Sequence, residues 1–277
     1  MVRLRVRRFD PTTLKPHRII IIVGKSVLQR DLLSRLADKL DFGLAMTPTE
    51  ESADTFREHM PDAWIYPTFS ASKLEAMLVM QRELVKVRKA RKLFIVLDDC
   101  MYDKKILKGV AMRDLFMNGR HLNITLCNAV QYIMDMGPDL RTQVDYVFAL
   151  RENIISNKMK LWKYFFGMFE KYEDFAKVMD KCTENHACMV MDNTTGSSNV
   201  DECIFWYRAD VDLPSFKLGK PVYWKLSEDY SKTEEDKRLE EQAELEELMH
   251  RRQGKKRIST VQIEDCDADT RPTLQFQ

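Results

Sequence analysis

The chain has 277 residues, of which 44% are hydrophobic and 10% aromatic, so it can bury a sizeable core and is not expected to be disordered. Glycine accounts for only 9 residues, which excludes collagen-like and glycine-rich linker compositions. The 44 Lys and Arg residues balance 43 Asp and Glu residues, but this net charge of +1 conceals an uneven distribution.

The amino-terminal end is basic. Residues 1–30 contain eight Lys or Arg residues against the single acid Asp10. In the first ten residues Arg alternates with Val or Leu, a pattern without the apolar centre of a signal peptide. No apolar run approaches the roughly 18 residues of a membrane helix, and the six cysteines form no C-x-x-C pair. We therefore expect no membrane span and a reduced, intracellular compartment.

In chain order, strands alternate with helices. The first strand is Ile19–Val23, five consecutive β-branched residues that indicate burial on both faces of a sheet. Apolar residues at helical spacing follow over 27–40. Further strands are expected at 44–47, 64–66, 93–97, 122–126 and 146–150, and further helices at 50–59, 71–90, 103–118 and 170–181. Segments 186–191 and 203–208 are expected to form an antiparallel edge pair.

This alternation predicts an α/β fold in which a mostly parallel sheet is covered by helices on both faces. The composition divides the chain into a basic segment (1–17), a globular domain (18–225), a charged helix (226–257) and a disordered tail (258–277).

Gly24-Lys25-Ser26 lies between the first strand and the first helix, which is the position of a phosphate-binding loop. In such a loop Lys reaches the β- and γ-phosphates and Ser holds Mg²⁺. The full pattern is G-x-x-x-x-G-K-[ST], and the position of its first glycine is occupied by Ile19. An ordinary strand-to-helix turn is the alternative.

The strand 93–97 ends in Asp98-Asp99, which fits the second motif of nucleotide hydrolases. There the first acid orients Mg²⁺ and the second polarises the attacking water. After the next strand comes Gln131, a residue type that can sense the γ-phosphate or position the water. Acids often end strands, and a loop amide can simply bond to backbone, so both features have structural alternatives.

Two clusters could contact a nucleic acid backbone. They are the arginines of 2–8 and the run 86–92, which includes Arg88, Lys89 and Arg91. Solvated surface faces are the alternative. A zinc site at Cys182, His186, Cys188 and Cys203 is disfavoured, because the spacing is not that of a usual zinc knuckle and 187–190 has the pattern of a core strand.

The order of these motifs resembles the genome-packaging ATPases of large DNA viruses, the poxvirus-like branch of the FtsK–HerA superfamily. The resemblance spans roughly residues 9–225. It is carried by FDPTTLKPHRIIIIVG at 9–24, TPTE at 47–50, LFIVLDD at 93–99, RDLFMNGRHLN at 113–123, QY at 131–132 and PDLRTQVDYVF at 138–148.

The resemblance implies a RecA-like P-loop core that assembles into a homo-oligomeric ring and uses ATP and Mg²⁺ to drive double-stranded DNA into a capsid. The roles it implies are Lys25 and Ser26 on phosphate and Mg²⁺, Asp98 on Mg²⁺, Asp99 as catalytic carboxylate and Gln131 as sensor. Arg120 and Arg141 are both candidates for the arginine that reaches a neighbouring subunit's γ-phosphate. Capsid or packaging proteins would be partners, in the host cytoplasm, the virus factory or the virion.

One departure from the family pattern affects the function. Gly24 is followed at once by Lys25-Ser26, as though about five residues were lost between two similar Gly-Lys steps. The missing segment would supply backbone amides that cradle phosphate. Two functions therefore remain open: an ATP-driven DNA translocase, or a nonhydrolysing P-loop-fold scaffold or ring subunit. A small-molecule P-loop kinase is a third, without a specific acceptor motif.

Overall fold

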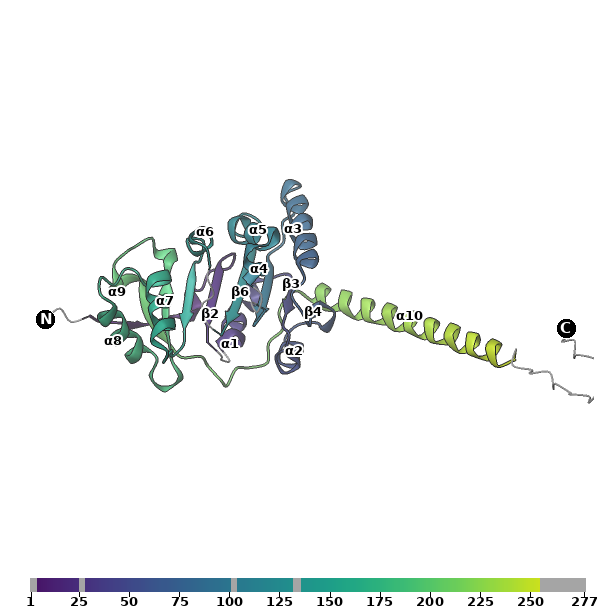
Figure 1. The fold of residues 1–277 in the computed structure, drawn as a ribbon. Coiled ribbons are helices and arrows are strands. Elements are labelled where there is room, and N and C mark those ends of the chain that lie inside the picture. Colours follow the sequence, from purple (N-terminus) through teal and green to yellow (C-terminus); the bar gives the residue numbers. More distant parts are fainter. Residues whose placement is uncertain (1–3, 25–27, 101–103, 132–135, 255–277) are drawn as a thin grey trace, which may run out of the picture. The chain divides into compact units, whose positions relative to one another are not determined.

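The computed structural model describes residues 4–24, 28–100, 104–131 and 136–254 (Figure 1). Within these ranges its strands form one sheet in the order β1-β9-β8-β7-β2-β6-β5-β3-β4. The strands are β1 (Arg7–Arg8), β2 (Ile19–Val23), β3 (Phe42–Met46), β4 (Ile65–Tyr66), β5 (Leu93–Asp98), β6 (Ile124–Val130), β7 (Tyr146–Ala149), β8 (Cys188–Asp192) and β9 (Ile204–Tyr207).

Helices connect most of these strands. They are α1 (Leu28–Leu36), α2 (Glu50–Arg57), α3 (Ala71–Lys86), α4 (Lys104–Lys108), α5 (Val110–Asn118), α6 (Pro138–Arg141), α7 (Ile155–Phe165), α8 (Tyr172–Cys182), α9 (Val200–Cys203) and α10 (Pro221–Gly254). The sequence pattern missed α7, a helix that packs the aromatic Phe165 into the core.

The centre of the sheet is parallel. β2 pairs in parallel with both β6 and β7, and β5 pairs in parallel with both β6 and β3. Numbered along the chain, β2, β3, β5, β6 and β7 stand in the order 5-1-4-3-2, the arrangement of a RecA-like P-loop core. The predicted fold class is confirmed.

The antiparallel pairing of β8 with β9 is also confirmed. This pair does not form the edge, however, because the two-residue β1 lies outside it in parallel with β9. Across that pairing the Arg7 guanidinium lies 5.7 Å from the ring centre of Phe205, and that of Arg8 lies 5.9 Å from the ring of Trp206. These cation–π contacts of the exposed edge strand β1 add to its backbone pairing with β9.

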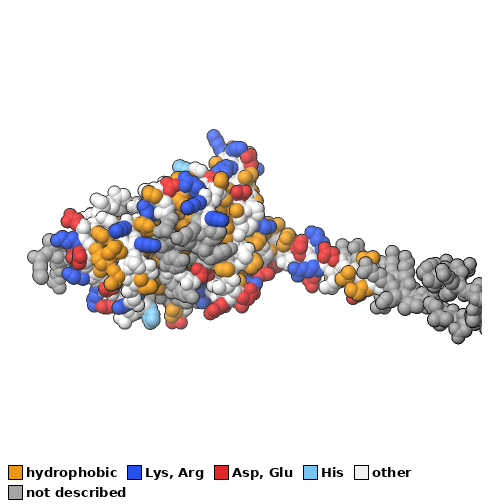
Figure 2. All heavy atoms as spheres, viewed as in Figure 1, with side chains coloured by type: hydrophobic (Ala, Val, Ile, Leu, Met, Phe, Trp, Pro, Cys, Tyr) orange, Lys and Arg blue, Asp and Glu red, His pale blue; other side chains and the backbone are white. Residues whose placement is uncertain are grey.

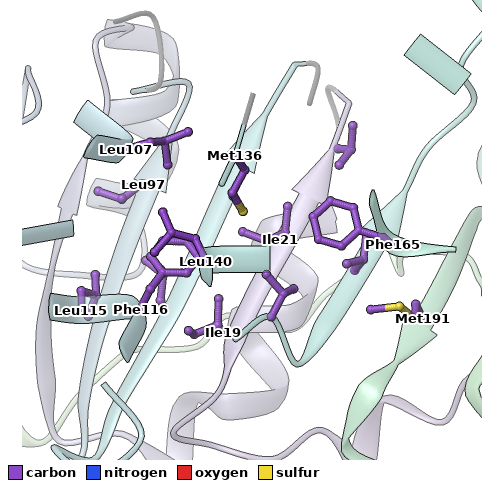
Figure 3. Close-up of a cluster of buried hydrophobic side chains, with 14 of the residues drawn as sticks. Ile19, Ile21, Leu97, Leu107, Leu115, Phe116, Met136, Leu140, Phe165 and Met191 are labelled. Atoms are coloured by element: carbon purple, nitrogen blue, oxygen red, sulfur yellow. The ribbon is translucent and has the colours of Figure 1, made fainter. Parts of the chain in front are cut away.

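Both faces of the sheet are buried, which explains the unbroken apolar run in β2. Ile19 and Ile21 face one hydrophobic cluster, and Ile20 and Ile22 face the other. Figure 3 shows the first cluster, with Leu115 and Phe116 of α5, Leu140 of α6 and Phe165 of α7 around Ile19 and Ile21. The second cluster packs α1, through Leu28, Leu32, Leu33 and Leu36, with Phe9, Leu14 and Tyr223.

A buried polar contact holds α1 against the sheet. The carboxylate of Asp31 is fully buried; the Tyr207 hydroxyl donates to its Oδ2 over 2.5 Å, and Arg35 Nε donates to its Oδ1 over 3.2 Å. Because Tyr207 ends β9, this contact joins the first helix to a strand 176 positions away. It positions α1, whose first residue, Leu28, follows Gly24 by four positions.

The chain divides into two compact units, residues 1–230 and 231–277. In the second unit the described residues belong to α10, and its apolar side chains Leu239, Leu245 and Leu248 are exposed. Among the described residues, no helix combines the length and apolar character needed to cross a bilayer.

His59 contacts the segment at 216–218, which precedes α10. Its ring is buried and stacks on Phe216 with 4.1 Å between ring centres, its Nδ1 lies 3.2 Å from the Phe216 carbonyl oxygen, and its own carbonyl accepts from Leu218 N over 2.7 Å. Burial lowers the pKa of His59 below its ordinary value of 6.5.

We predict that this histidine makes the fold less stable in mild acid. Below pH 6.5 the unfolded chain binds a proton at His59 that the folded chain binds only at lower pH, so the free energy of unfolding falls as the pH falls. His59→Gln should flatten the decline between pH 7 and pH 5 in urea unfolding. Burial also lowers the pKa of His17, so His17→Gln should flatten it further. An unchanged slope in both variants would contradict the prediction.

Candidate nucleotide site

The carboxyl ends of three parallel strands meet at one cavity. Gly24 follows β2, Asp98 ends β5 with Asp99 next to it, and Gln131 follows β6; all four residues line a cavity of about 440 Å³. The register explains the meeting, because Val23 pairs with Val130 and Asp98 pairs with Ala129. Ligands of open α/β sheets bind at this edge. The structure therefore gathers four of the predicted site residues.

Gly24 occupies a backbone conformation that side chains disfavour. Its φ is +112°, and a Cβ at this position would lie 2.9 Å from the Cβ of Leu150. Its N–H donates to the Val130 carbonyl over 2.8 Å, which keeps β2 paired with β6 up to the last residue. The predicted phosphate ligands Lys25 and Ser26 lie outside the described residues, and α1 begins at Leu28.

Asp98 has a partner that the pattern of acids did not reveal. The hydroxyl of Thr47, which is 1% exposed, donates to Asp98 Oδ2 over 3.3 Å and lies 3.4 Å from the hydroxyl of Thr49. Thr47 begins the TPTE segment at 47–50, and that segment was the signal that could have identified it. Thr47 thus orients one oxygen of the acid that the resemblance assigns to Mg²⁺.

Asp99 and Gln131 touch each other. Gln131 Nε2 donates a hydrogen bond to Asp99 Oδ2. The backbone of Asp99 is left-handed, with φ of +51°, and its N–H donates to the Ala129 carbonyl over 3.1 Å. A left-handed aspartate is strained, and such strain concentrates at functional sites. The predicted catalytic carboxylate and the predicted sensor therefore form one unit at the ends of β5 and β6.

The lining of the cavity also contains a cation. Arg30 of α1 lines the cavity, and its only ion pair among the described residues is with Glu58, at 3.7 Å between Nη2 and Oε2. Its Nε is buried and has no hydrogen-bond partner among the described groups. A buried donor without a partner is costly unless something accepts from it. The sequence did not indicate a role for Arg30, because one arginine in a helix has no distinguishing pattern.

Helix α2 completes the wall. It contributes a carboxylate and two hydroxyls, and Thr49 precedes its first residue. The residues are Thr49, Glu51, Ser52 and Thr55. The cavity therefore combines acids, hydroxyls and amides with one described arginine, which suits an anionic ligand that carries a divalent cation.

Arg120 lies at the opposite edge of the sheet. It precedes β6, whose seven residues separate it from Gln131 by about 23 Å at the usual rise of 3.3 Å per residue. Its Nε donates to Asp145 Oδ2 over 3.2 Å, and its Nη2 donates to the Gln143 carbonyl over 2.7 Å. Asp145 is buried and also accepts from Ile19 N over 2.8 Å. Arg120 therefore cannot reach the cavity of its own chain.

Arg141, the other arginine candidate, ends α6. Its guanidinium lies 4.1 Å from the ring centre of Tyr164, and Arg141 does not line the cavity described above.

The predicted DNA-binding residues are also remote from the cavity. Arg88, Lys89 and Arg91 are exposed and connect the end of α3 to the start of β5, at the same edge as Arg120. In Figure 2, Lys and Arg side chains gather at the tip of α3, whereas Asp and Glu side chains gather over α2. The two edges of the sheet thus differ in charge character.

The cysteines of the disfavoured zinc site lie in the hydrophobic core. Cys182, Cys188 and Cys203 are buried, and burial raises the pKa of the Cys182 thiol to about 11. No group of three or more potential metal ligands of the His, Cys, Asp and Glu types occurs in the described part of the chain. These thiols serve as core residues.

No protein-family model matches the chain. It is 34% identical over 219 residues to uncharacterized protein 015R of Frog virus 3 (isolate Goorha), covering 77% of this chain and 66% of that protein. It is 31% identical over 196 residues to uncharacterized protein L437 of Acanthamoeba polyphaga mimivirus, covering 67% of this chain and 69% of that protein. The chain belongs to this family of large DNA virus proteins. It spans slightly less than two thirds of the length of the Frog virus 3 member.

Solved structures of similar fold include B204, the genome packaging NTPase of Sulfolobus turreted icosahedral virus 2, in complex with ATP-gammaS. That likeness has a TM-score of 0.48 and 15% identity and covers 71% of this chain and 99% of B204. The cytoplasmic domain of the type VII secretion ATPase EccC of Thermomonospora curvata gives a TM-score of 0.46 at 15% identity. That likeness covers 72% of this chain and 26% of the EccC chain. The fold of this chain is therefore assigned from its own strand order and register, and not from these likenesses.

We predict that Gly24→Ala destabilises the fold more than a matched glycine substitution. Forcing a side chain into a sparsely populated backbone region costs about 1–3 kcal/mol, and the new Cβ would press on Leu150 in addition. Gly196 is the control, because its φ is +70° but no described heavy atom lies within 4 Å of the place that a Cβ would occupy. Urea unfolding should show a loss at least about 1 kcal/mol larger for Gly24→Ala. Equal losses would mean that the contact with Leu150 relaxes at no cost.

Proposed function

We propose that this family member is an ATP-driven DNA translocase that packages a viral genome into its capsid. The observation that carries the proposal is the meeting of Gly24, Asp98, Asp99 and Gln131 at one cavity, with Gln131 bonded to Asp99. Nucleotide hydrolysis needs an acid for the metal, an acid for the water and a polar sensor, and these residues can supply them. The packaging role is supported by the motif order along residues 9–225.

The donor set at Asp98 suits Mg²⁺. A carboxylate oriented by the Thr47 hydroxyl is the hard oxygen ligand that Mg²⁺ prefers, and Ser26 would be the second protein ligand. When bound with ATP, the metal would neutralise charge on the β- and γ-phosphates.

Asp99 would hold the attacking water. Gln131 bonds Oδ2 of Asp99, so Oδ1 can accept a hydrogen bond from the O–H of a water molecule. As this water attacks the γ-phosphorus, its proton passes to Asp99 and the bond to the β-phosphate oxygen breaks, giving ADP and phosphate. Arg30 would hold its guanidinium toward the phosphates from α1.

A ring would complete the site. Because the length of β6 separates Arg120 from its own cavity, this arginine can act only on the nucleotide of a neighbouring copy. Arg141 remains the other candidate for that role. Such a motor would work with capsid or packaging proteins where virions assemble, in the host cytoplasm or virus factory, or in the virion.

The short connection between β2 and α1 favours a second function. Only 24–27 separate the strand from the helix, and Ile19 stands where a full phosphate loop begins with glycine. Losing one preorganised donor costs about 2.7–4 kcal/mol of transition-state stabilisation. With several amides missing, the chain would serve as a nonhydrolysing scaffold or ring subunit of a packaging complex.

A repair experiment tests the roles given to Asp98, Asp99 and Gln131, and the hydrolysis rate of the unmodified chain, measured beside it, decides between the two functions. Inserting Lys-Arg-Gly-Ser-Gly between Gly24 and Lys25 restores the full phosphate-loop pattern while β2 and α1 keep their places. We predict that Mg²⁺-dependent ATP hydrolysis appears or rises at least ~10²-fold, as expected for one or two recovered donors. The measurement is phosphate release with duplex DNA present.

Asp99→Asn in the repaired protein is the control and should abolish hydrolysis, because the amide cannot accept the proton of the water. If the repaired protein is folded and bound to DNA but inactive, the roles given to Asp98, Asp99 and Gln131 lose their main support. The scaffold function would then be preferred.

We also predict sequence-independent DNA binding through the basic run at 86–92. The logarithm of affinity should fall linearly with the logarithm of salt concentration, with a slope of ~0.9 per phosphate contact on duplex DNA. Replacing Arg88, Lys89 and Arg91 by Ala should reduce that slope by up to ~2.7. Fluorescence anisotropy over a salt series measures it.

The charge-matched control replaces Lys163, Lys171 and Lys177, which are exposed on or next to α7 and α8. This control should leave the slope nearly unchanged. Equal effects of the two triple variants would show that net charge alone sets the affinity, and the cluster at 86–92 would be an ordinary solvated surface.

A further inference from the structure

Gly24 lines a second cavity. This cavity also measures about 440 Å³, and its walls include Leu150, Arg151, Thr183, Asn185 and His186. The strand order places the two cavities on different sides of Gly24, because β2 lies between β6 and β7. The first cavity extends toward β6, β5 and α2, and the second extends toward β7 and the start of β8.

The far wall of the second cavity is an unusual turn between α8 and β8. Ala187 N donates to the Glu184 carbonyl over 3.1 Å, and the two residues between them are both left-handed, with φ of +51° at Asn185 and +61° at His186. This is the geometry of a type I′ turn, in which glycine is the least strained residue, above all at the second central position. The chain instead keeps two polar side chains there.

Those side chains are suited to a planar heterocycle. Both are exposed, and both line the cavity. The Asn185 amide can donate to and accept from the edge of a base, and the planar groups of His186 and Arg151 can stack on its face. Leu150 supplies an apolar surface beside them. Strained backbone conformations are concentrated at ligand-binding sites, so two polar residues held in one at a cavity are candidate ligand contacts.

The location of the acids indicates which end of a ligand that spans both cavities would lie in which cavity. Asp98, Asp99 and Gln131 belong to the first cavity only, so the phosphates and their metal would lie there. The part of the ligand that continues past Gly24 then enters the second cavity.

We propose that the cavity between β7 and the Asn185-His186 turn binds the nucleoside part of the nucleotide whose phosphates occupy the first cavity. This inference rests on the proposed nucleotide-binding function and adds the site that recognises the base. It makes the turn, not the phosphate loop, the determinant of preference among ATP, GTP, CTP and UTP.

The test compares ATP with inorganic tripolyphosphate, which has the phosphates but no nucleoside. Binding to the full chain is measured by calorimetry with Mg²⁺ for wild type and for the double variant Asn185→Gly, His186→Gly. Glycine favours the left-handed turn, so the variant should fold with an unchanged or higher melting temperature. We expect ATP affinity to fall at least about tenfold and tripolyphosphate affinity to stay within about twofold.

Asn123→Gly is the matched control. Asn123 is another left-handed asparagine, with φ of +53°, but it precedes β6 at the opposite edge of the sheet. This variant should leave both affinities unchanged. The control separates loss of the cavity side chains from any general effect of replacing a left-handed residue by glycine.

The remaining outcomes are distinct. If wild type binds ATP no more tightly than tripolyphosphate, or if the double variant weakens both ligands equally or neither, the nucleoside site is refuted while the phosphate site stands. If wild type binds neither ligand, the proposed function fails, and the nucleoside site fails with it.

Discussion

The parallel pairing of β2 with two neighbours is the constraint on which the site depends. On one side of β2 the Val23 carbonyl accepts a hydrogen bond from the N–H of Leu150. On the other side the N–H of Gly24 donates a hydrogen bond to the Val130 carbonyl. These bonds hold the end of β2 level with the ends of β6 and β7. Every polar group that follows those strands is thereby delivered to a common edge. The positive φ of Gly24 then turns the chain away toward α1 without breaking either pairing.

The two edges of the sheet have different physical roles. The carboxyl edge combines the Asp98-Asp99 pair with the Gln131 amide and the Arg30 guanidinium. At the amino edge the buried Asp145 forms ion pairs with Arg18 at 3.5 Å and with Arg120 at 3.1 Å, while the charged residues of 86–92 are exposed. Because a strand is rigid, the charges of one edge cannot reach the other within a chain. Contact between the charges of the two edges would therefore need a second copy of the chain.

Backbone strain is concentrated at the same two edges. Asp99, Asn185 and His186 are left-handed at the carboxyl edge, and Asn123 is left-handed at the amino edge. Such conformations each cost on the order of 1–3 kcal/mol and persist only where the surrounding structure holds them. In this chain the strands hold them, because each follows or precedes a strand whose side chains are almost completely buried. The core thus stabilises a site geometry that the local sequence alone would not adopt.

Patterns of neighbouring residues were enough to predict the central strands and the acids that follow them. A strand buried on both faces must be continuously apolar, so Ile19–Val23 and the run before Asp98-Asp99 could be recognised without a structure. Tertiary structure alone decided which side chains meet: Thr47 with Asp98 across 51 positions, and Gly24 with the turn at 185–186 across about 160. Those contacts depend on strand order, which is a long-range property with no local pattern. For the same reason, only the fold showed that Arg120 is bound to Asp145 and is separated from its own cavity by the length of β6.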